Sequence, residues 1–157
     1  MRTRGFEVVQ RLEGTDIKLP ERSTKMSAGY DFFAYEDVTI PSMWKTAPKG
    51  TLEPTIVKTG IKAYMKEDEV LEMYDRSSNP KKLGLVIPNA VGIIDADYYG
   101  NPDNDGEICF EFYNVFPFDV TIHAGEKLGQ GIFKNFLKVD GDNTTAERLG
   151  GIGSTGR

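Results

Sequence analysis

The sequence predicts an all-β domain, and three observations support that prediction. Short runs of alternating apolar and polar residues recur along the chain, whereas apolar residues at helical spacing are almost absent. Gly, Pro, Asn and Asp separate these runs, and 17 glycines supply many turns. The length of 157 residues suits one domain with a substantial core. Regularly spaced short strands of this kind build sandwiches, jelly rolls or closed barrels.

The expected strands follow one another along the chain, each bounded by turn residues. They cover residues 6–12, 38–40, 55–65, 69–74, 83–87, 91–94, 107–114, 120–123 and 127–137. Within residues 108–112 large apolar side chains alternate with Cys109 and Glu111. Because side chains alternate across a strand, one face should meet the core and the other is available for a site.

Outside the strands, the sequence predicts one short helix and one long loop. Asn79 is expected as the N-cap of the helix, with Pro80 at its first helical position. The Pro-rich stretch around Trp44 is expected to form a long surface loop or hairpin. It contains three prolines, Pro41, Pro48 and Pro54.

Charge and composition exclude several classes of protein. The net charge of −5 and the pI of about 5.0 argue against a general nucleic-acid-binding surface, which needs clustered positive charge. No apolar run has the length of a membrane span, and residues 1–6 lack the apolar core of a signal peptide. A single cysteine, Cys109, cannot form an internal disulfide, so we expect a cytoplasmic protein. A single histidine, His123, excludes a histidine triad and a multi-histidine zinc site.

Two carboxylates end the apolar run at residues 92–94, and paired aromatic residues follow them. Asp95 and Asp97 lie two residues apart, and on an extended strand they would project to the same side. Tyr98 follows where the strand turns. A charged group at the end of an apolar strand is costly unless it is paired or used. This segment is therefore the first candidate for chemistry.

Two further segments are candidates for binding, each with an ordinary structural alternative. Residues 75–82 combine Arg76, Ser77 and Ser78 with a helix start, which suits an anion. The alternative is a capped turn with solvated charges. Residues 125–130 form a turn that leads into a strand, and taken alone they are better explained as an ordinary hairpin.

The C-terminus and one internal loop also leave alternatives open. Residues 148–157 are rich in glycine and form either a disordered tail or an arm that orders over a phosphate. Such an arm would use backbone N–H groups with Arg148, Ser154 and Thr155. Residues 101–106 combine Asp, Asn and Gly, which suits a cation, although a solvated turn is the favoured interpretation.

Five segments together are more informative than any one of them. In chain order they are Ala28-Gly29-Tyr30-Asp31, Arg76-Ser77-Ser78, Gly92-Ile-Ile-Asp95-Ala-Asp97-Tyr98, Gly125-Glu-Lys-Leu-Gly-Gln130 and Gly153-Ser-Thr-Gly156. This series resembles the five motifs of the trimeric dUTPase family, the deoxyuridine triphosphate nucleotidohydrolases. The resemblance runs from about residue 15 to the end of the chain.

The resemblance implies an architecture and an activity. The fold would be a jelly-roll-like distorted barrel of the dUTPase-like β-clip type, with one short helix. Residues 1–140 would form the barrel and residues 141–157 a flexible arm that closes an active site. Three copies would form a homotrimer with active sites at their interfaces. The reaction would be Mg²⁺-dependent hydrolysis of dUTP to dUMP and pyrophosphate, with no nucleic-acid or membrane partner.

The resemblance also implies roles for individual residues. Asp95 would be the catalytic base that activates the water attacking the α-phosphate, and Asp31 would hold Mg²⁺ through water. Tyr98 would pack on the deoxyribose and leave no room for a 2′-hydroxyl. The other substrate-binding positions are Asn89, Ile93, Ile94 and Cys109 around the base, Arg76, Ser77, Ser78 and Gln130 at the phosphates, and Arg148, Ile152, Gly153, Ser154 and Thr155 in the arm.

The chain departs from the family pattern in three places. Ile152 stands where the arm usually carries an aromatic residue that stacks on uracil. An aliphatic lid gives up that stacking geometry, so we expect weaker or less discriminating closure, not loss of activity. The spacing from Arg148 to Ile152 is one residue shorter than the common form, and residues 101–106 form an insertion after the third motif.

Two other functions compete with dUTP hydrolysis. The related dCTP deaminases share the fold and carry a catalytic glutamate three residues before an asparagine, as Glu111 precedes Asn114 here. A deaminase or a bifunctional deaminase and dUTPase is therefore one alternative, although Asp97-Tyr98 matches the dUTPase form and Lys82 stands where deaminases carry arginine. The other alternative is a non-catalytic regulatory binding protein on the same scaffold. Retention of the motifs argues against lost catalysis.

Overall fold

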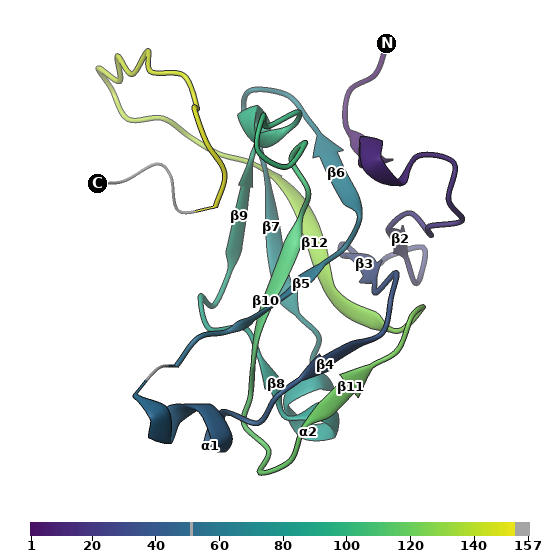
Figure 1. Ribbon diagram of the computed structural model, residues 1–157. Helices are drawn as coiled ribbons and strands as arrows, with labels where there is room; N and C mark the ends of the chain where they lie inside the picture. Colours follow the sequence, from purple (N-terminus) through teal and green to yellow (C-terminus); the bar gives the residue numbers. More distant parts are fainter. Residues whose placement is uncertain (51, 153–157) are drawn as a thin grey trace.

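Antiparallel β-sheets dominate the computed structural model, which describes residues 1–50 and 52–152 (Figure 1). The strands are β1 (Gly5–Val8), β2 (Glu21–Arg22), β3 (Tyr30–Phe33), β4 (Val38–Ile40), β5 (Thr55–Lys58), β6 (Ile61–Tyr64), β7 (Glu69–Asp75), β8 (Leu85–Val86), β9 (Gly92–Asp95), β10 (Cys109–Asn114), β11 (Val120–Ile122) and β12 (Lys127–Asn135). The helices are α1 (Met43–Thr46) and α2 (Asn79–Leu83), with 3₁₀ turns η1 (Gln10–Leu12), η2 (Ala47–Lys49) and η3 (Ala96–Tyr98). The all-β prediction is confirmed.

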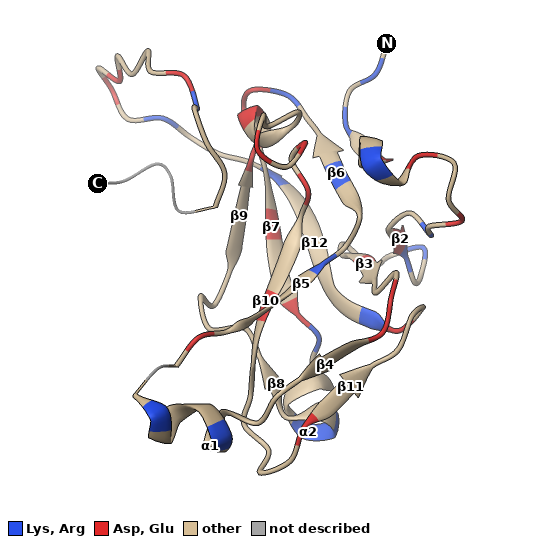
Figure 2. Cartoon of the chain, in the orientation of Figure 1, with Lys and Arg blue, Asp and Glu red and all other residues tan. Residues whose placement is uncertain are grey.

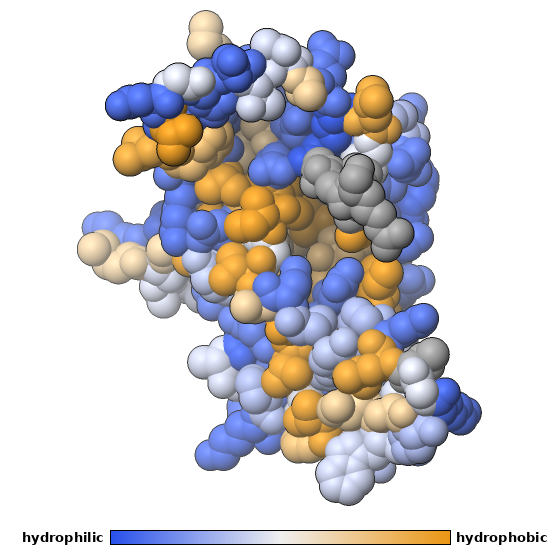
Figure 3. Space-filling view, turned by 90° about the vertical axis from the view of Figure 1, so that its left-hand side faces the viewer, coloured by the Kyte–Doolittle hydropathy of each residue, from blue (hydrophilic) through white to orange (hydrophobic). Residues whose placement is uncertain are grey.

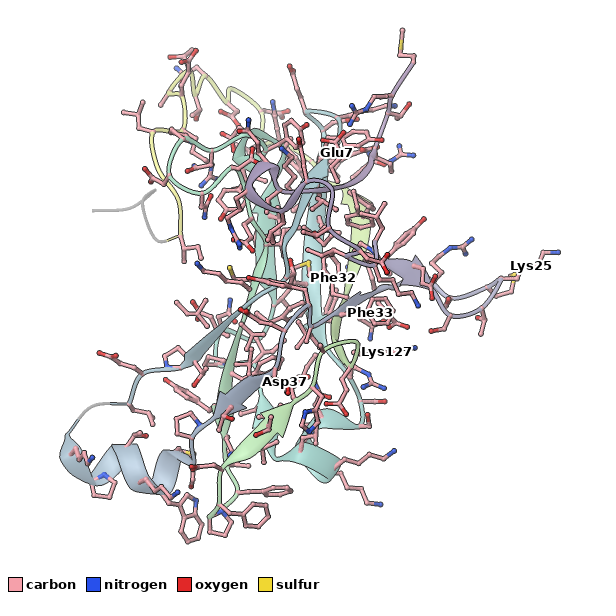
Figure 4. All side chains as sticks on the ribbon, turned by 45° about the vertical axis from the view of Figure 1, so that its right-hand side comes forward. Glu7, Lys25, Phe32, Phe33, Asp37 and Lys127 are labelled. Carbon is pink, nitrogen blue, oxygen red and sulfur yellow. The ribbon has the colours of Figure 1, made fainter. Side chains whose placement is uncertain are left out.

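The largest sheet has the strand order β2-β3-β12-β7-β9. Smaller sheets, β5-β10-β8, β1-β6 and β11-β4, pack around it. The core between them is apolar and aromatic, with Phe32 of β3 completely buried near the middle of the molecule (Figure 4). The ring of Phe32 meets that of Phe110 edge-on, with 5.8 Å between the ring centroids. Burial of these rings stabilises the fold, because folding removes their large apolar surface from water.

The predicted alternation in β10 is confirmed. Phe110 and Phe112 are buried, whereas Cys109 and Glu111 are only partly buried on the opposite face. Their strand pairs with β5 along one edge and with β8 along the other. This central position fixes the two outward-facing side chains beside β9, where the site described below lies.

Several predicted strand boundaries are wrong, and turn chemistry explains the differences. The run at residues 6–12 leaves β1 after Val8 and continues as η1. The run at residues 55–65 is two strands, β5 and β6, because Gly60 adopts a positive φ of 71° and breaks it. The strand β3, which carries Asp31, was not predicted, since it is a short run of Tyr, Asp and two Phe without simple alternation.

The two predicted non-strand segments also differ from expectation. The stretch around Trp44 forms α1 and η2 rather than a loop or hairpin, and the Ser42 side chain caps α1 by accepting the Trp44 N–H at 3.2 Å. In α2 the N-cap position belongs to Ser78, and Asn79 lies inside the first turn. Asn79 is buried there, and its side-chain amide donates to Asp75 Oδ1 at 2.6 Å and to the Leu128 carbonyl at 2.8 Å.

Beyond β12, described residues 136–152 contain no helix or strand and return beside β9 (Figure 1). We call this segment the arm. Among the described residues, none of the helices combines the length and the apolar character needed to cross a bilayer. Acidic residues gather at the turn that follows β9, next to the path of the arm (Figure 2).

Candidate functional site

A pocket of about 160 Å³ opens between β9, β10, η3 and the arm. Apolar side chains supply much of its wall, and apolar residues surround a hollow on this face of the molecule (Figure 3). Its lining contains eight residues that the sequence singled out: Asn89, Ile93, Ile94, Asp95, Tyr98, Cys109, Arg148 and Ile152. Residues that sequence reasoning did not assign to substrate also line it, namely Met73, Ile87, Gly92, Glu107, Phe110, Glu111 and Gly151.

The carboxylate of Asp95 lies at the mouth of this pocket, where β9 ends. Its side chain is half exposed, and it forms an ion pair with Arg148 of the arm. Arg148 also holds Asp97, with 2.7 Å between Nε and Oδ1. The expectation that both aspartates lie on one extended strand is wrong, because the backbone turns into η3 directly after Asp95. The arginine nevertheless brings both carboxylates together.

Tyr98 forms a fixed wall of the pocket. Its side chain is buried, and its hydroxyl donates to the Glu107 carbonyl at 3.0 Å and accepts from Asn104 Nδ2 at 2.7 Å. Burial raises the pKa of Tyr98 above its ordinary value, so the phenol stays protonated near neutral pH. A ring anchored at both its apolar body and its hydroxyl defines the shape of the pocket and cannot easily yield to a larger ligand.

Asn89 reaches the pocket from a tight turn between β8 and β9. Ala90, the next residue, has a positive φ of 62°, and the Val91 N–H donates to the Asn89 carbonyl at 2.7 Å. Gly92 then begins β9, where an added Cβ would lie 3.1 Å from Met73. This close approach packs the strand against β7 and leaves the Asn89 amide at the rim of the pocket, where it can hydrogen-bond a polar ligand.

Cys109 lines the pocket as a protonated thiol. Burial raises the pKa of Cys109 to about 11, with Glu107 as a further cause. The thiolate is the nucleophilic form, so the protonated Cys109 thiol is a poor nucleophile at neutral pH.

This pKa predicts slow alkylation of Cys109. At pH 8, iodoacetamide should modify the native protein at least ~10-fold more slowly than the urea-unfolded chain, because the native thiol stays almost fully protonated and is partly buried. The native rate should then rise as the pH approaches 11. Mass spectrometry of timed samples measures both rates, and equal rates at pH 8 would contradict the assigned environment.

A second group of site residues lies away from the pocket. This group, the polar cluster, comprises Asp31 of β3, Gln130 and Lys127 of β12, and Arg76 and Ser77 after β7. Asp31 and Gln130 are direct partners in the β3–β12 pairing. Arg76 donates to the Lys127 carbonyl at 3.3 Å.

Lys127 is the member of the polar cluster that sequence reasoning missed. Its Nζ lies 2.6 Å from Asp31 Oδ2 and 2.9 Å from Ser23 Oγ. In Figure 4 Lys127 is labelled close to Phe33. Burial acts to raise the pKa of Asp31, but hydrogen bonds from Lys127 and Ser23 outweigh it and lower that pKa. The carboxylate is therefore ionised at neutral pH. The place of Lys127 inside the fourth motif was the available signal.

Gly29 packs closely against the side chain of Gln130. A Cβ added at Gly29 would lie 2.1 Å from Gln130 Oε1, so a side chain there would displace this amide from its present position. Gln130 Nε2 in turn donates to the Asp75 carbonyl at 3.4 Å. Ser77 is exposed and Ser78 half-buried beside it. The result is a set of cationic, amide and hydroxyl donors suited to an anion.

The pocket and the polar cluster lie at opposite ends of β7. In the β7–β9 pairing Asp95 lies opposite Val70, whereas Gly129 lies opposite Asp75 at the far end. The five residue steps between Val70 and Asp75 span roughly 17 Å at the rise of a strand. In Figure 1 the turn after β9 is at the top and α2 is at the bottom. One chain therefore does not bring the two groups together.

The other residues that the sequence singled out lie outside the described residues or away from the pocket. Gly153, Ser154 and Thr155 lie outside the described residues. His123 is exposed and pairs with Asp37, with 3.2 Å between Nδ1 and Oδ2. It does not line the pocket.

Comparison with known proteins places these features in a family. A family model described as dUTPase matches residues 15–156. The deoxyuridine 5′-triphosphate nucleotidohydrolase of Lactococcus lactis subsp. lactis (strain IL1403) is 49% identical over 158 residues, which covers 99% of each protein. The crystal structure of dUTPase from Streptococcus mutans has a TM-score of 0.75 at 42% identity, covering 87% of this chain and 99% of that one. A mutant dUTPase from phage phi11 of S. aureus, 20% identical with a TM-score of 0.68, covers 92% of this chain and 98% of its own and is similar in fold.

Proposed function

Because this chain belongs to the dUTPase family, it is a hydrolase of deoxyuridine 5′-triphosphate, and we propose that Asp95 activates the water that attacks the α-phosphate. The bond from the α-phosphorus to the bridging oxygen breaks, which gives dUMP and pyrophosphate. One observation carries the proposal: Asp95 and Tyr98 line one pocket with Asn89 and Cys109, the positions expected around a pyrimidine. A half-exposed carboxylate at the pocket mouth can accept a proton from water while remaining open to a phosphate.

The pocket explains the choice of substrate through shape. Tyr98 is held by two hydrogen bonds and is buried, so the sugar must fit against a rigid ring. A ribose 2′-hydroxyl would meet this wall, which favours deoxynucleotides. Ile152 of the arm lines the pocket and would cover the base with an aliphatic lid. That lid excludes water without the stacking that an aromatic residue supplies.

The polar cluster would hold the phosphate chain, and a second copy of the protein would supply it. The support is the separation of the two groups at opposite ends of β7. Leu137 is 96% exposed and Val139 is 79% exposed in the first residues of the arm. Exposed apolar residues of this size favour contact with another protein surface. The family resemblance points to a homotrimer, with Arg76, Ser77 and Gln130 from one copy facing the pocket of another.

Magnesium would enter with the substrate rather than in a protein cage. The described residues contain no cluster of three or more acidic, His or Cys side chains suited to a metal ion. Asp31 is a lone ionised carboxylate beside Lys127, which fits contact with a hydrated cation held by phosphates. Coordination of a structural Mg(II) ion is described for the phage phi11 dUTPase mutant. When bound, Mg²⁺ would neutralise charge on the phosphates.

A parallel assay tests this function against its alternatives. The protein is incubated with Mg²⁺ and dUTP, dCTP or dTTP, and pyrophosphate and ammonia are both measured. We expect pyrophosphate from dUTP and little from the other two nucleotides. Ammonia from dCTP would instead support a deaminase that uses Glu111, which does line the pocket. The absence of both products would indicate a binding protein on the same scaffold.

A further inference from the structure

The loop after η3, residues 99–106, contains the insertion at residues 101–106 and is ordered by hydrogen bonds of its own. Asn101 orders it from within: its Oδ1 accepts the Asp103 N–H at 3.0 Å, and its carbonyl accepts the Asp105 N–H at 2.7 Å. Asp105 and Gly106 adopt positive φ angles of 60° and 80°. We call this segment the docking loop.

Contacts with the rest of the domain hold the docking loop in place. Asp105 pairs with Lys62 at 2.8 Å and accepts the Gln10 N–H at 2.8 Å. Asn104 donates to the Tyr98 hydroxyl at 2.7 Å. These partners belong to β6, η1 and η3, so the loop is fixed on three sides.

Two other polar side chains of the docking loop, Asn101 and Asp103, contact the arm. Asn101 Nδ2 donates to the Gly150 carbonyl at 2.8 Å, and Asp103 Oδ2 accepts the Gly151 N–H at 3.3 Å. Asn101 is only 4% exposed, so its amide is satisfied by the arm rather than by bulk water. Both contacts go to the arm backbone: Asn101 binds the carbonyl and Asp103 binds the N–H of the Gly150–Gly151 peptide group. The next residue, Ile152, lines the pocket.

We propose that the docking loop is the element that positions the arm over the pocket, with Asn101 and Asp103 as positioning residues. Together with the ion pair between Asp97 and Arg148, these contacts fix the arm at two points just before Ile152, which lines the pocket. Such a second anchor suits an arm that lacks the aromatic stacking residue. The catalytic consequence rests on the proposed function, whereas the docking contact itself does not.

Trypsin cleavage after Arg148 tests the docking contact without using activity. Asn101→Asp keeps the Oδ1 acceptor but replaces the donor with an oxygen that repels the Gly150 carbonyl. Asp103→Ala removes the acceptor for Gly151 and is exposed, so it keeps the test valid even if the buried Asn101 variant folds poorly. Asn143→Asp makes the same chemical change at an exposed site and is the control.

We expect both loop variants to be cut at the Arg148–Leu149 bond about 3- to 10-fold faster than the wild type and the control, the range that loss of one hydrogen bond gives. Release of the 149–157 peptide, followed by mass spectrometry, measures the rate. Cleavage at the wild-type rate in both variants would overturn the proposal. If the wild-type protein did not hydrolyse dUTP, the proposed function would be refuted, but the cleavage rates would still test the docking contact.

Nucleotide affinity separates positioning from a general structural effect. Asn101→Asp should weaken binding of an α,β-imido analogue of dUTP by a similar 3- to 10-fold factor in the full-length protein. In chains that end at Leu149, which lack Gly150 and Gly151, the same substitution should change affinity by less than about twofold. An equal loss in both backgrounds would show that Asn101 acts on the pocket itself and would overturn the positioning role.

Discussion

Asp95→Asn is expected to keep nucleotide binding while turnover falls by about 10³-fold, within the range that a general base contributes. The amide has nearly the shape of the carboxylate but cannot accept a proton from water. Asp95 lies at the mouth of the pocket and not among its buried residues, so the wall that contacts base and sugar should stay intact. Steady-state kinetics with dUTP and titration with the imido analogue measure the two effects separately.

Asp97→Asn is the matched control for that variant. It makes the same change in the other carboxylate that Arg148 holds, but Asp97 does not line the pocket. We expect a change of less than about 10-fold in kcat, because only the anchoring of the arm is weakened. If Asp95→Asn hydrolysed dUTP at a near-normal rate, the assignment of the base would be refuted. Equal large losses in both variants would point to Arg148 anchoring instead of proton transfer.

Truncation after Leu149 is expected to lower kcat/KM for dUTP by about 100-fold or more. It removes Ile152 from the pocket, together with the Gly150 and Gly151 contacts to the docking loop. Without this cover, water enters the site and the phosphates lose the donors expected from the arm. Pyrophosphate release measures the effect.

Stability is the internal control for truncation. Residues 150–152 are exposed or only partly buried and belong to no strand or helix, so removal should leave the thermal unfolding midpoint nearly unchanged. The oligomeric state on gel filtration should also be retained. A truncated protein that hydrolysed dUTP at the full rate would show that the arm is only a tail.

The fold was predictable where alternation and turn residues agreed. β10 followed from its two-residue period, and β4, β7 and β11 were placed to within one residue of their observed ends. Predictions failed where local conformation depends on tertiary packing. β3 is only four residues long, and α1 depends on a cap from Ser42, whose backbone N–H is itself held by Asp119 at 3.0 Å. Such long-range partners are invisible to a pattern of neighbours.

The site was predictable in its residue types more than in its arrangement. Motif order identified Asp95, Tyr98 and Asn89, and the structure brings them to one pocket. Motif order did not reveal that Arg148 binds Asp95 and Asp97, because 51 to 53 residues separate these partners along the chain. The docking loop was recognised as an insertion, but its role depends on contacts with an arm distant in sequence.

The central claim is that each active site combines the pocket of one copy with the polar cluster of another. Two variants test it directly: Asp95→Asn, which disables the pocket, and Arg76→Ala, which disables the polar cluster. Each should be almost inactive alone. If the two are unfolded together in equal amounts and refolded, about a quarter of the sites should pair an intact pocket with an intact cluster. The account predicts that dUTP hydrolysis returns to that level in the mixture, whereas a mixture as inactive as its parents would contradict it.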